Sequence, residues 1–165
     1  MPNIVAAQIV EAMTTRGLHL AIAESLTGGA LAAAVVDVPG ASKMFLGSIV
    51  AYDTSLKASL LGVDDALLAK VGAVDSKVAT QMAAGARLRL ATAAKVSEAA
   101  TVGLACTGVA GPNIQDGKPV GTVFISVDAP GGALVRELLV AGDRSQIRKS
   151  TVGSALNLLA EVLGL

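Results

Sequence analysis

Helical and strand-like segments alternate along the chain, and this alternation limits the possible folds more than any other feature of the sequence. Apolar residues from Ile4 to Met13 recur at helical spacing, and Gly17 marks the end of that helix. Short apolar runs without this spacing are typical of buried strands. We expect helices at 3–16, 30–36, 54–61, 64–71, 76–91 and 143–163, and strands at 18–23, 45–52, 100–106, 120–127 and 133–140.

The order of these segments predicts the fold class. The last two expected strands flank Pro130-Gly131-Gly132, which is typical of a hairpin turn. Alternating helices and strands with one late hairpin favour a single α/β domain with a mixed sheet over residues 1–165. An all-α fold is the alternative, because Ala-rich runs can hide helices among the apparent strands.

The composition limits what the domain can bind. The chain is 53% hydrophobic and carries 13 basic and 13 acidic residues, which excludes disorder and leaves no net charge to attract nucleic acid or an anionic membrane. Phe45, Tyr52 and Phe124 are its only aromatic residues, so little is available for stacking on bases. One histidine and one cysteine cannot form a His/Cys metal site or an internal disulfide. We expect no nucleic-acid or membrane partner, no metal and no cofactor.

Targeting signals are also missing from the sequence. The apolar stretches are interrupted well before the 18 or more residues that a membrane span requires. The N-terminus lacks the basic start and apolar core of a signal peptide. We therefore expect a cytoplasmic protein.

The segment Glu24-Ser25-Leu26-Thr27-Gly28-Gly29 joins an expected strand to an expected helix. Backbone N–H groups at such a helix start can hold a phosphate or an oxyanion, and the hydroxyl of Ser25 or Thr27 can add a donor. Ordinary helix capping with glycine flexibility is the alternative. Ser42, in the string Pro39-Gly40-Ala41-Ser42, is a second candidate for a nucleophile or substrate ligand, or is part of a simple turn.

Tyr52 and Lys57 follow the second expected strand. A lysine held among apolar residues can lose its proton at neutral pH and act as a base, which allows a Ser/Lys or Ser/Tyr/Lys arrangement without histidine. This matters because His19 is the only histidine and falls within an expected core strand. A solvated helix lysine is the alternative for Lys57.

Two further groups of residues are candidates for binding a substrate. Thr107 and Gly108 follow an apolar run, and the glycine allows a ligand to approach the backbone, although tight turns explain the pattern equally well. Arg144 and Arg148 are four residues apart on one face of the last helix, where they can bind a phosphate or form a solvated stripe. Cys106 is interpreted as a small buried side chain.

Taken together, these strings resemble the CinA C-terminal domain family, which includes nicotinamide mononucleotide amidohydrolases. The resemblance covers nearly the whole chain and rests on ordered strings: Ala23-Glu24-Ser25-Leu26-Thr27-Gly28-Gly29, Asp37-Val38-Pro39-Gly40-Ala41-Ser42, Val50-Ala51-Tyr52 with Lys57, Leu61-Gly62-Val63, Gly72-Ala73-Val74, Thr107-Gly108-Val109-Ala110-Gly111-Pro112, Lys118-Pro119-Val120-Gly121-Thr122 and Gly142-Asp143-Arg144 with Arg148. It implies a three-layer α/β/α domain that forms homo-oligomers. It also implies a stand-alone form, because longer members carry an additional N-terminal domain.

The resemblance implies deamidation of nicotinamide mononucleotide to nicotinate mononucleotide and ammonia, in pyridine nucleotide salvage. Amide hydrolysis needs a nucleophile, a base and an oxyanion site. Our hypothesis is that Ser25 attacks the carboxamide, Lys57 is the base and Tyr52 orients or relays the proton. Ser42 is the alternative nucleophile.

The same hypothesis assigns the remaining polar groups of the site to the oxyanion and the substrate phosphate. Backbone amides at residues 25–29, or those near Thr107 and Gly108, stabilise the oxyanion. The phosphate is held by Arg144, Arg148 and the turn at Thr107-Gly108.

The chain departs from the family pattern at three places. Leu26 stands where the family usually has Cys, Asp75 stands where it often has Ser, and Asn113-Ile114-Gln115-Asp116 replaces a usual glycine pair. We expect the last of these segments to shape the substrate pocket. Two other functions stay open: a non-catalytic module that binds a pyridine nucleotide or ADP-ribose, and a purely structural oligomerisation domain.

Overall fold

The computed structural model describes residues 3–165, and its helices follow the sequence pattern closely. The helices are α1 (Ile4–Thr15), α2 (Ala30–Val36), α3 (Thr54–Leu61), α4 (Asp65–Val71), α5 (Ser76–Ala94) and α6 (Arg144–Leu163), with 3-10 turns at Ala41–Lys43 and Glu98–Ala100. Side chains that accept backbone N–H groups begin five of these helices: Asn3, Asp53, Asp64, Asp75 and Asp143. These caps satisfy donors that the first turn of a helix would otherwise leave unpaired, and they explain where the helices start.

Five strands form one mixed sheet in the order β2-β1-β3-β4-β5. They are β1 (His19–Glu24), β2 (Phe45–Val50), β3 (Thr101–Gly108), β4 (Thr122–Ala129) and β5 (Gly132–Leu139). β1 runs parallel to β2 and to β3, whereas β3, β4 and β5 pair antiparallel. The carboxyl ends of β1, β2 and β3 therefore lie at the same end of the sheet, where α/β proteins usually bind their ligands.

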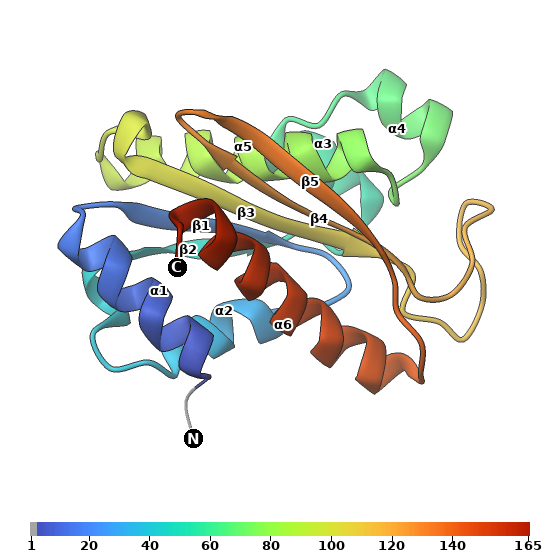
Figure 1. Cartoon of the computed structure of the whole chain (residues 1–165). Helices are drawn as coiled ribbons and strands as arrows, with labels where there is room; N and C mark the ends of the chain where they lie inside the picture. The colour runs from blue at the N-terminus through green and yellow to red at the C-terminus, as the bar shows by residue number, and fades with distance from the viewer. Residues whose placement is uncertain (1–2) are drawn as a thin grey trace.

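Helices cover both faces of this sheet, as Figure 1 shows: α1, α2 and α6 lie on one face, and α3 and α5 on the other. Alternate side chains of β1 point to opposite faces of the sheet, so this strand contributes to the cores on both faces. Leu20 and Ile22 belong to the core under α1 and α6, whereas Ala21 and Ala23 belong to the core under α5. α5 approaches so closely that a Cβ at Gly103 would collide with its backbone. Small residues on the second face thus allow the helix to pack tightly.

The predicted α/β class, the mixed sheet and the three layers are confirmed. The all-α alternative is wrong, because the apolar runs pair with one another as strands. The fourth strand begins at Thr122 rather than at Val120, since Gly121 adopts a φ of 90° that an extended strand does not accommodate. The expected boundaries otherwise differ from the observed ones by a few residues at the ends of elements.

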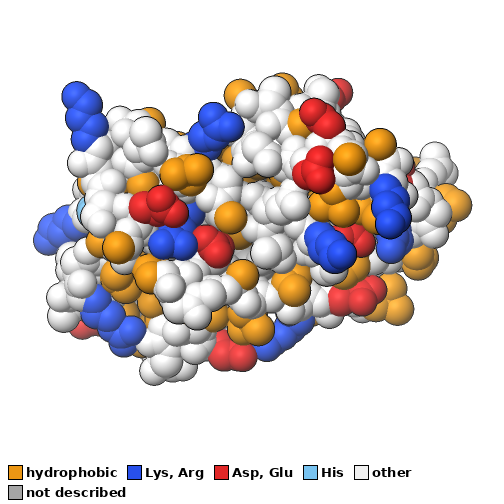
Figure 2. Space-filling view, turned by 90° about the horizontal axis from the view of Figure 1, so that it is seen from above, with side chains coloured by type: hydrophobic (Ala, Val, Ile, Leu, Met, Phe, Trp, Pro, Cys, Tyr) orange, Lys and Arg blue, Asp and Glu red, His pale blue; other side chains and the backbone are white. Residues whose placement is uncertain are grey.

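Charges of both signs are mixed on the side of the molecule that lies at the top of Figure 1. Figure 2 shows Lys and Arg side chains there among acidic and neutral ones, without one continuous basic patch. Within residues 3–165, none of the helices combines the length and the apolar character needed to cross a membrane.

Candidate active site

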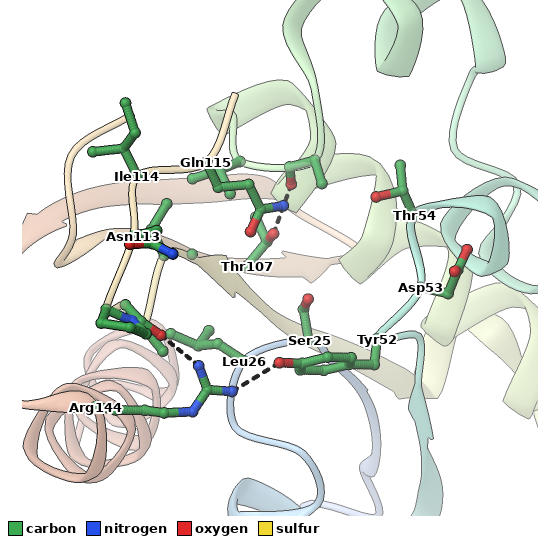
Figure 3. A pocket seen from close by; sticks show the side chains of 17 residues that line it. Ser25, Leu26, Tyr52, Asp53, Thr54, Thr107, Asn113, Ile114, Gln115 and Arg144 are labelled. Atoms are coloured by element: carbon green, nitrogen blue, oxygen red, sulfur yellow. Dashed lines mark hydrogen bonds between the residues drawn. The ribbon is translucent and has the colours of Figure 1, made fainter. Parts of the chain in front are cut away.

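A cavity of about 510 Å³ opens at the carboxyl ends of β1 and β3. This volume lies within the range of small-molecule sites. Its lining comes from the turn after β1, the start of α3, residues 107–115 after β3, and Arg144 of α6 (Figure 3). Segments that are distant in the sequence therefore meet around one space, at the place that the strand directions predict.

Ser25 and Lys57 form a buried polar pair at the floor of this cavity. Consecutive side chains point to opposite faces of a strand, so Glu24 turns toward α2 and Ser25 toward α3. Lys57 of α3 is only 1% exposed, and its Nζ donates to Ser25 Oγ over 3.1 Å and to the carbonyl oxygen of Ala51 over 2.7 Å. Of the pair, Ser25 lines the cavity, and Lys57 Nζ lies directly behind its hydroxyl.

Burial lowers the pKa of Lys57 to about 8, because the charged ammonium loses its hydration. The negative charge of Asp53 raises this pKa by a smaller amount. The alternative of a solvated helix lysine is therefore wrong. A lysine with this pKa is partly unprotonated near neutral pH and can accept a proton from a hydroxyl.

The start of α2 does not offer its N–H groups to a ligand, because a carboxylate from the protein already occupies it. Glu24 is fully buried and accepts from the N–H groups of Gly29 and Ala32 over 2.9 and 3.0 Å. Thr27 is buried as well, and its hydroxyl donates to Glu24 over 2.7 Å. The structure therefore does not support the prediction that Thr27, Gly28 and Gly29 hold a substrate anion.

Thr107 and Gly108 line the cavity at the end of β3, as the sequence predicts. The Thr107 hydroxyl donates to the carbonyl oxygen of Ala73 over 2.6 Å, which leaves its oxygen as an acceptor. A Cβ added at Gly108 would lie only 2.7 Å from the Val123 side chain. Close packing between β3 and β4 therefore accounts for this glycine without any ligand.

Tyr52 and Arg144 close one side of the cavity (Figure 3). Arg144 donates through Nη2 to the phenol oxygen of Tyr52 over 2.8 Å and through Nη1 to the carbonyl oxygen of Gly111 over 2.6 Å. Tyr52 is 59% exposed. The structure thus places a guanidinium group at the cavity and links it to the loop after β3, which suits the binding of an anionic group.

Arg148 has a different position, although it lies one turn after Arg144. Its Nε donates to the carbonyl oxygen of Leu26 over 2.9 Å and its Nη2 to that of Thr27 over 2.8 Å. It borders a separate hollow between α2 and α6 rather than the main cavity. The prediction that both arginines hold one phosphate is therefore not supported, because Arg148 binds the turn after β1 instead.

Ser42 and His19 lie at the other end of the sheet. Ser42 is exposed in the 3-10 turn before β2, and His19 is the first residue of β1. Because β1 and β2 are parallel, the residues before them and Ser25 after β1 are separated by the length of a strand. The structure does not bring Ser42 to Lys57, so the alternative nucleophile lacks this base. His19 is a strand residue and Cys106 is a buried one, as predicted.

Two features of the site were not predicted. One is the set of five hydrogen-bond donors that surround the Glu24 carboxylate. The feature of the sequence that could have indicated it is a single acidic residue at the end of an apolar strand. The other is Asp116, which accepts from the backbone N–H of Ala73 over 3.1 Å and ties the 111–118 loop to the segment between α4 and α5. Residues 113–115 of this loop line the cavity, in agreement with the expectation that the loop shapes the pocket.

Comparison with known proteins places the chain in a family. The sequence model described as the CinA C-terminal domain matches residues 3–163. A CinA-like protein of Frankia casuarinae is 51% identical over 151 residues, which are 92% of this chain and 33% of the relative. A CinA-like protein of Anaeromyxobacter is 45% identical over 154 residues, 93% of this chain and 36% of the relative. The chain spans about a third of the length of the curated relatives it matches.

Solved structures agree with this assignment over the whole domain. The crystal structure of the competence/damage inducible protein CihA from Agrobacterium tumefaciens is 35% identical, with a TM-score of 0.87, and the match covers 98% of this chain and 94% of that one. A CinA superfamily protein from Escherichia coli is 29% identical, with a TM-score of 0.87 and coverage of 98% and 90%. The chain therefore belongs to the CinA C-terminal domain family.

Proposed function

We propose that this protein hydrolyses the carboxamide of nicotinamide mononucleotide, releasing ammonia and nicotinate mononucleotide. The observation that carries the proposal is the 3.1 Å contact between Lys57 Nζ and Ser25 Oγ at the floor of the cavity. A serine activated by a buried lysine is suited to attack at an acyl carbon. The family resemblance supplies the substrate, and the cavity is large enough for a mononucleotide.

In the first half of the reaction, unprotonated Lys57 takes the hydroxyl proton of Ser25 while Oγ bonds to the carboxamide carbon. The proton then passes to the amide nitrogen, the C–N bond breaks and ammonia leaves. The acyl group stays on Ser25 as an ester. This order needs a base whose pKa lies near the working pH, and burial provides it in Lys57.

In the second half, water attacks the ester carbon and Lys57 takes a proton from that water. The bond between the acyl carbon and Ser25 Oγ breaks, and the proton on Lys57 returns to the serine. The product leaves as a carboxylate, and its acid proton passes to the solvent. The hydroxyl and the amine are thereby restored, and no other group is consumed.

Arg144 is the group that we assign to the substrate phosphate, because its guanidinium lies at the cavity with Tyr52. To bind a phosphate, Arg144 would exchange its contact with Tyr52 or Gly111 for the anion. Because the Thr107 hydroxyl proton is already bonded to Ala73, contacts to the oxyanion would come from backbone N–H groups of the lining, at Leu26 or at Gly108.

The direct test is ammonia release from nicotinamide mononucleotide by the purified protein, with Lys57→Ala as the paired variant. We expect the wild-type protein to release one ammonia per nicotinate mononucleotide formed, and folded Lys57→Ala to be slower by at least about 1,000-fold. No release by folded wild-type protein at any pH from about 6 to 10 would reject the proposal. Saturable nucleotide binding without turnover would then indicate a binding module.

A further inference from the structure

We propose that Glu24 and Arg148 are positioning residues. They form hydrogen bonds to the turn between β1 and α2 from opposite sides and thereby hold Ser25 against Lys57. In its kinetic consequences this inference rests on the proposed function. Neither residue lines the cavity, so neither is a catalytic residue. The argument comes from the contacts that each makes with the turn.

Glu24 binds the turn from inside the protein. Its carboxylate is fully buried and accepts five hydrogen bonds of 2.7–3.0 Å from two hydroxyl and three N–H groups: Thr27 Oγ1, Ser48 Oγ, Gly29 N, Leu31 N and Ala32 N. A buried carboxylate is stable only when its oxygens are satisfied in this way. These bonds join the end of β1 to the first turn of α2 and, through Ser48, to β2.

Arg148 binds the same turn from the α6 side. Its Nε and Nη2 donate to the carbonyl oxygens of Leu26 and Thr27 over 2.9 and 2.8 Å. The planar guanidinium presents its two N–H donors in a fixed geometry, which the freely rotating ammonium of a lysine does not. A Cβ added at Gly28 would lie 3.6 Å from Arg148 Nη2, so the guanidinium packs directly on the turn.

The two residues are complementary in charge and in what they bind. Glu24 accepts hydrogen bonds from the hydroxyl and N–H donors of the turn, and Arg148 donates hydrogen bonds to its carbonyl oxygens. Ser25 lies in sequence between Glu24 and Leu26, whose carbonyl oxygen Arg148 binds, and its own N–H donates to the carbonyl oxygen of Cys106 over 3.1 Å. The turn is therefore fixed at three places, while the Ser25 hydroxyl is left to Lys57 and the cavity.

Removing the hydrogen bonds of Glu24 or Arg148 to the turn should lower the rate of the chemical step more than it weakens substrate binding. A displacement of about 1 Å of a reacting group can lower a rate about 100-fold. Substrate contacts at Arg144 and Thr107 belong to other segments and should stay in place. A residue that bound the phosphate would have the opposite signature, a higher KM.

The experiment measures covalent labelling of Ser25 by a small fluorophosphonate, followed by mass spectrometry of the peptide. Ser25 Oγ bonds to phosphorus, fluoride leaves and Lys57 accepts the proton, so the reaction reports the activated hydroxyl without any substrate. We expect Glu24→Gln and Arg148→Met to label about 100-fold more slowly than wild type, measured well below their Tm. Lys149→Met is the matched control, because it removes an exposed charge from the same turn of α6 and should label at the wild-type rate.

If Glu24→Gln does not fold, Ser48→Ala removes one of the five donors and should slow labelling about fivefold. In ammonia release, Arg148→Met should lower kcat about 100-fold and leave KM within about threefold. Wild-type labelling without ammonia release would reject the proposed function but leave the inference to be judged on labelling rates. The inference would be overturned if the folded variants were labelled at the wild-type rate, or if Ser25 of the wild type were not labelled at all. A raised KM with unchanged kcat in Arg148→Met would also overturn it.

Discussion

The floor and the roof of the cavity are built in different ways. The floor is formed by Ser25 and Leu26 of the β1–α2 turn, residues 24–29, with Lys57 behind them, and most side chains of this turn are buried. Glu24 and Arg148 bind this turn from its two sides. The side-chain oxygens of Glu24, Ser25 and Thr27 are all hydrogen-bonded within the protein, which limits the movement of the turn.

The roof is the loop 111–118, and its side chains are mostly exposed. Its ties to the rest of the molecule include the bond from Ala73 N to Asp116 and the bond from Arg144 to the carbonyl oxygen of Gly111. Ile114 lines the cavity and is also 69% exposed, so an apolar side chain stands open at the entrance.

This difference suggests a division of tasks. The chemical step needs its reacting atoms held within fractions of an ångström, which a buried turn held by many hydrogen bonds provides. Selection and release of a substrate tolerate a surface loop, which can move and can change in sequence at little cost to the fold. Changes to the floor should therefore act on kcat, and changes to the roof on KM.

The largest effect should come from Ser25→Ala, which removes the hydroxyl that Lys57 contacts. We expect kcat for ammonia release to fall by at least about 1,000-fold. The comparison is Ser42→Ala, which removes an exposed hydroxyl at the far end of the sheet and should keep kcat within about threefold. A large loss of kcat in Ser42→Ala with activity retained in Ser25→Ala would reverse the assignment of the nucleophile.

Arg144→Met should have the next largest effect. The change removes a charged donor at the junction of floor and roof while keeping much of the side-chain volume. We expect KM to rise about 10- to 100-fold, since a hydrogen bond to a charged group is worth about 1.5–3 kcal/mol. Steady-state kinetics of Arg144→Met beside Arg148→Met test this split. An unchanged KM in Arg144→Met would remove Arg144 from the phosphate site.

Asp116→Ala should have a smaller effect that is confined to the roof. It breaks the bond from Ala73 N, worth about 1 kcal/mol, and frees the loop from the α4–α5 segment. We expect KM to rise about fivefold with kcat nearly constant, and the amides of residues 111–118 to exchange hydrogen faster. A fall in kcat of similar size would show that floor and roof do not act separately.

Strand directions explain how far the sequence could predict the site. The periodicity located each strand and helix to within a few residues, and polar residues after β1 and β3 marked the correct end of the sheet. Ser42 precedes β2 whereas Ser25 follows β1, so parallel pairing alone places them at opposite ends. The choice between the two serines therefore needed the sheet topology and not more motif evidence.

Other parts of the site depend on packing that spacing cannot show. Arg144 and Arg148 share a helix face, yet only Arg144 lines the cavity. Which of the two arginines contacts the cavity depends on how α6 packs against the sheet. The burial of Lys57 likewise depends on α3 packing against the end of β1. The sequence marked Glu24 as polar but gave no sign of the five donors that surround it.

The central claim is that buried Lys57 acts as the base for Ser25, and the pH dependence of kcat/KM for ammonia release tests it most directly. The base must be unprotonated, so activity should rise as the pH rises through the pKa of Lys57, about 8, and level off above it. Below that pKa we expect about a tenfold gain for each pH unit. A profile that stays flat across this range, or that falls as the pH rises through 8, would contradict the account.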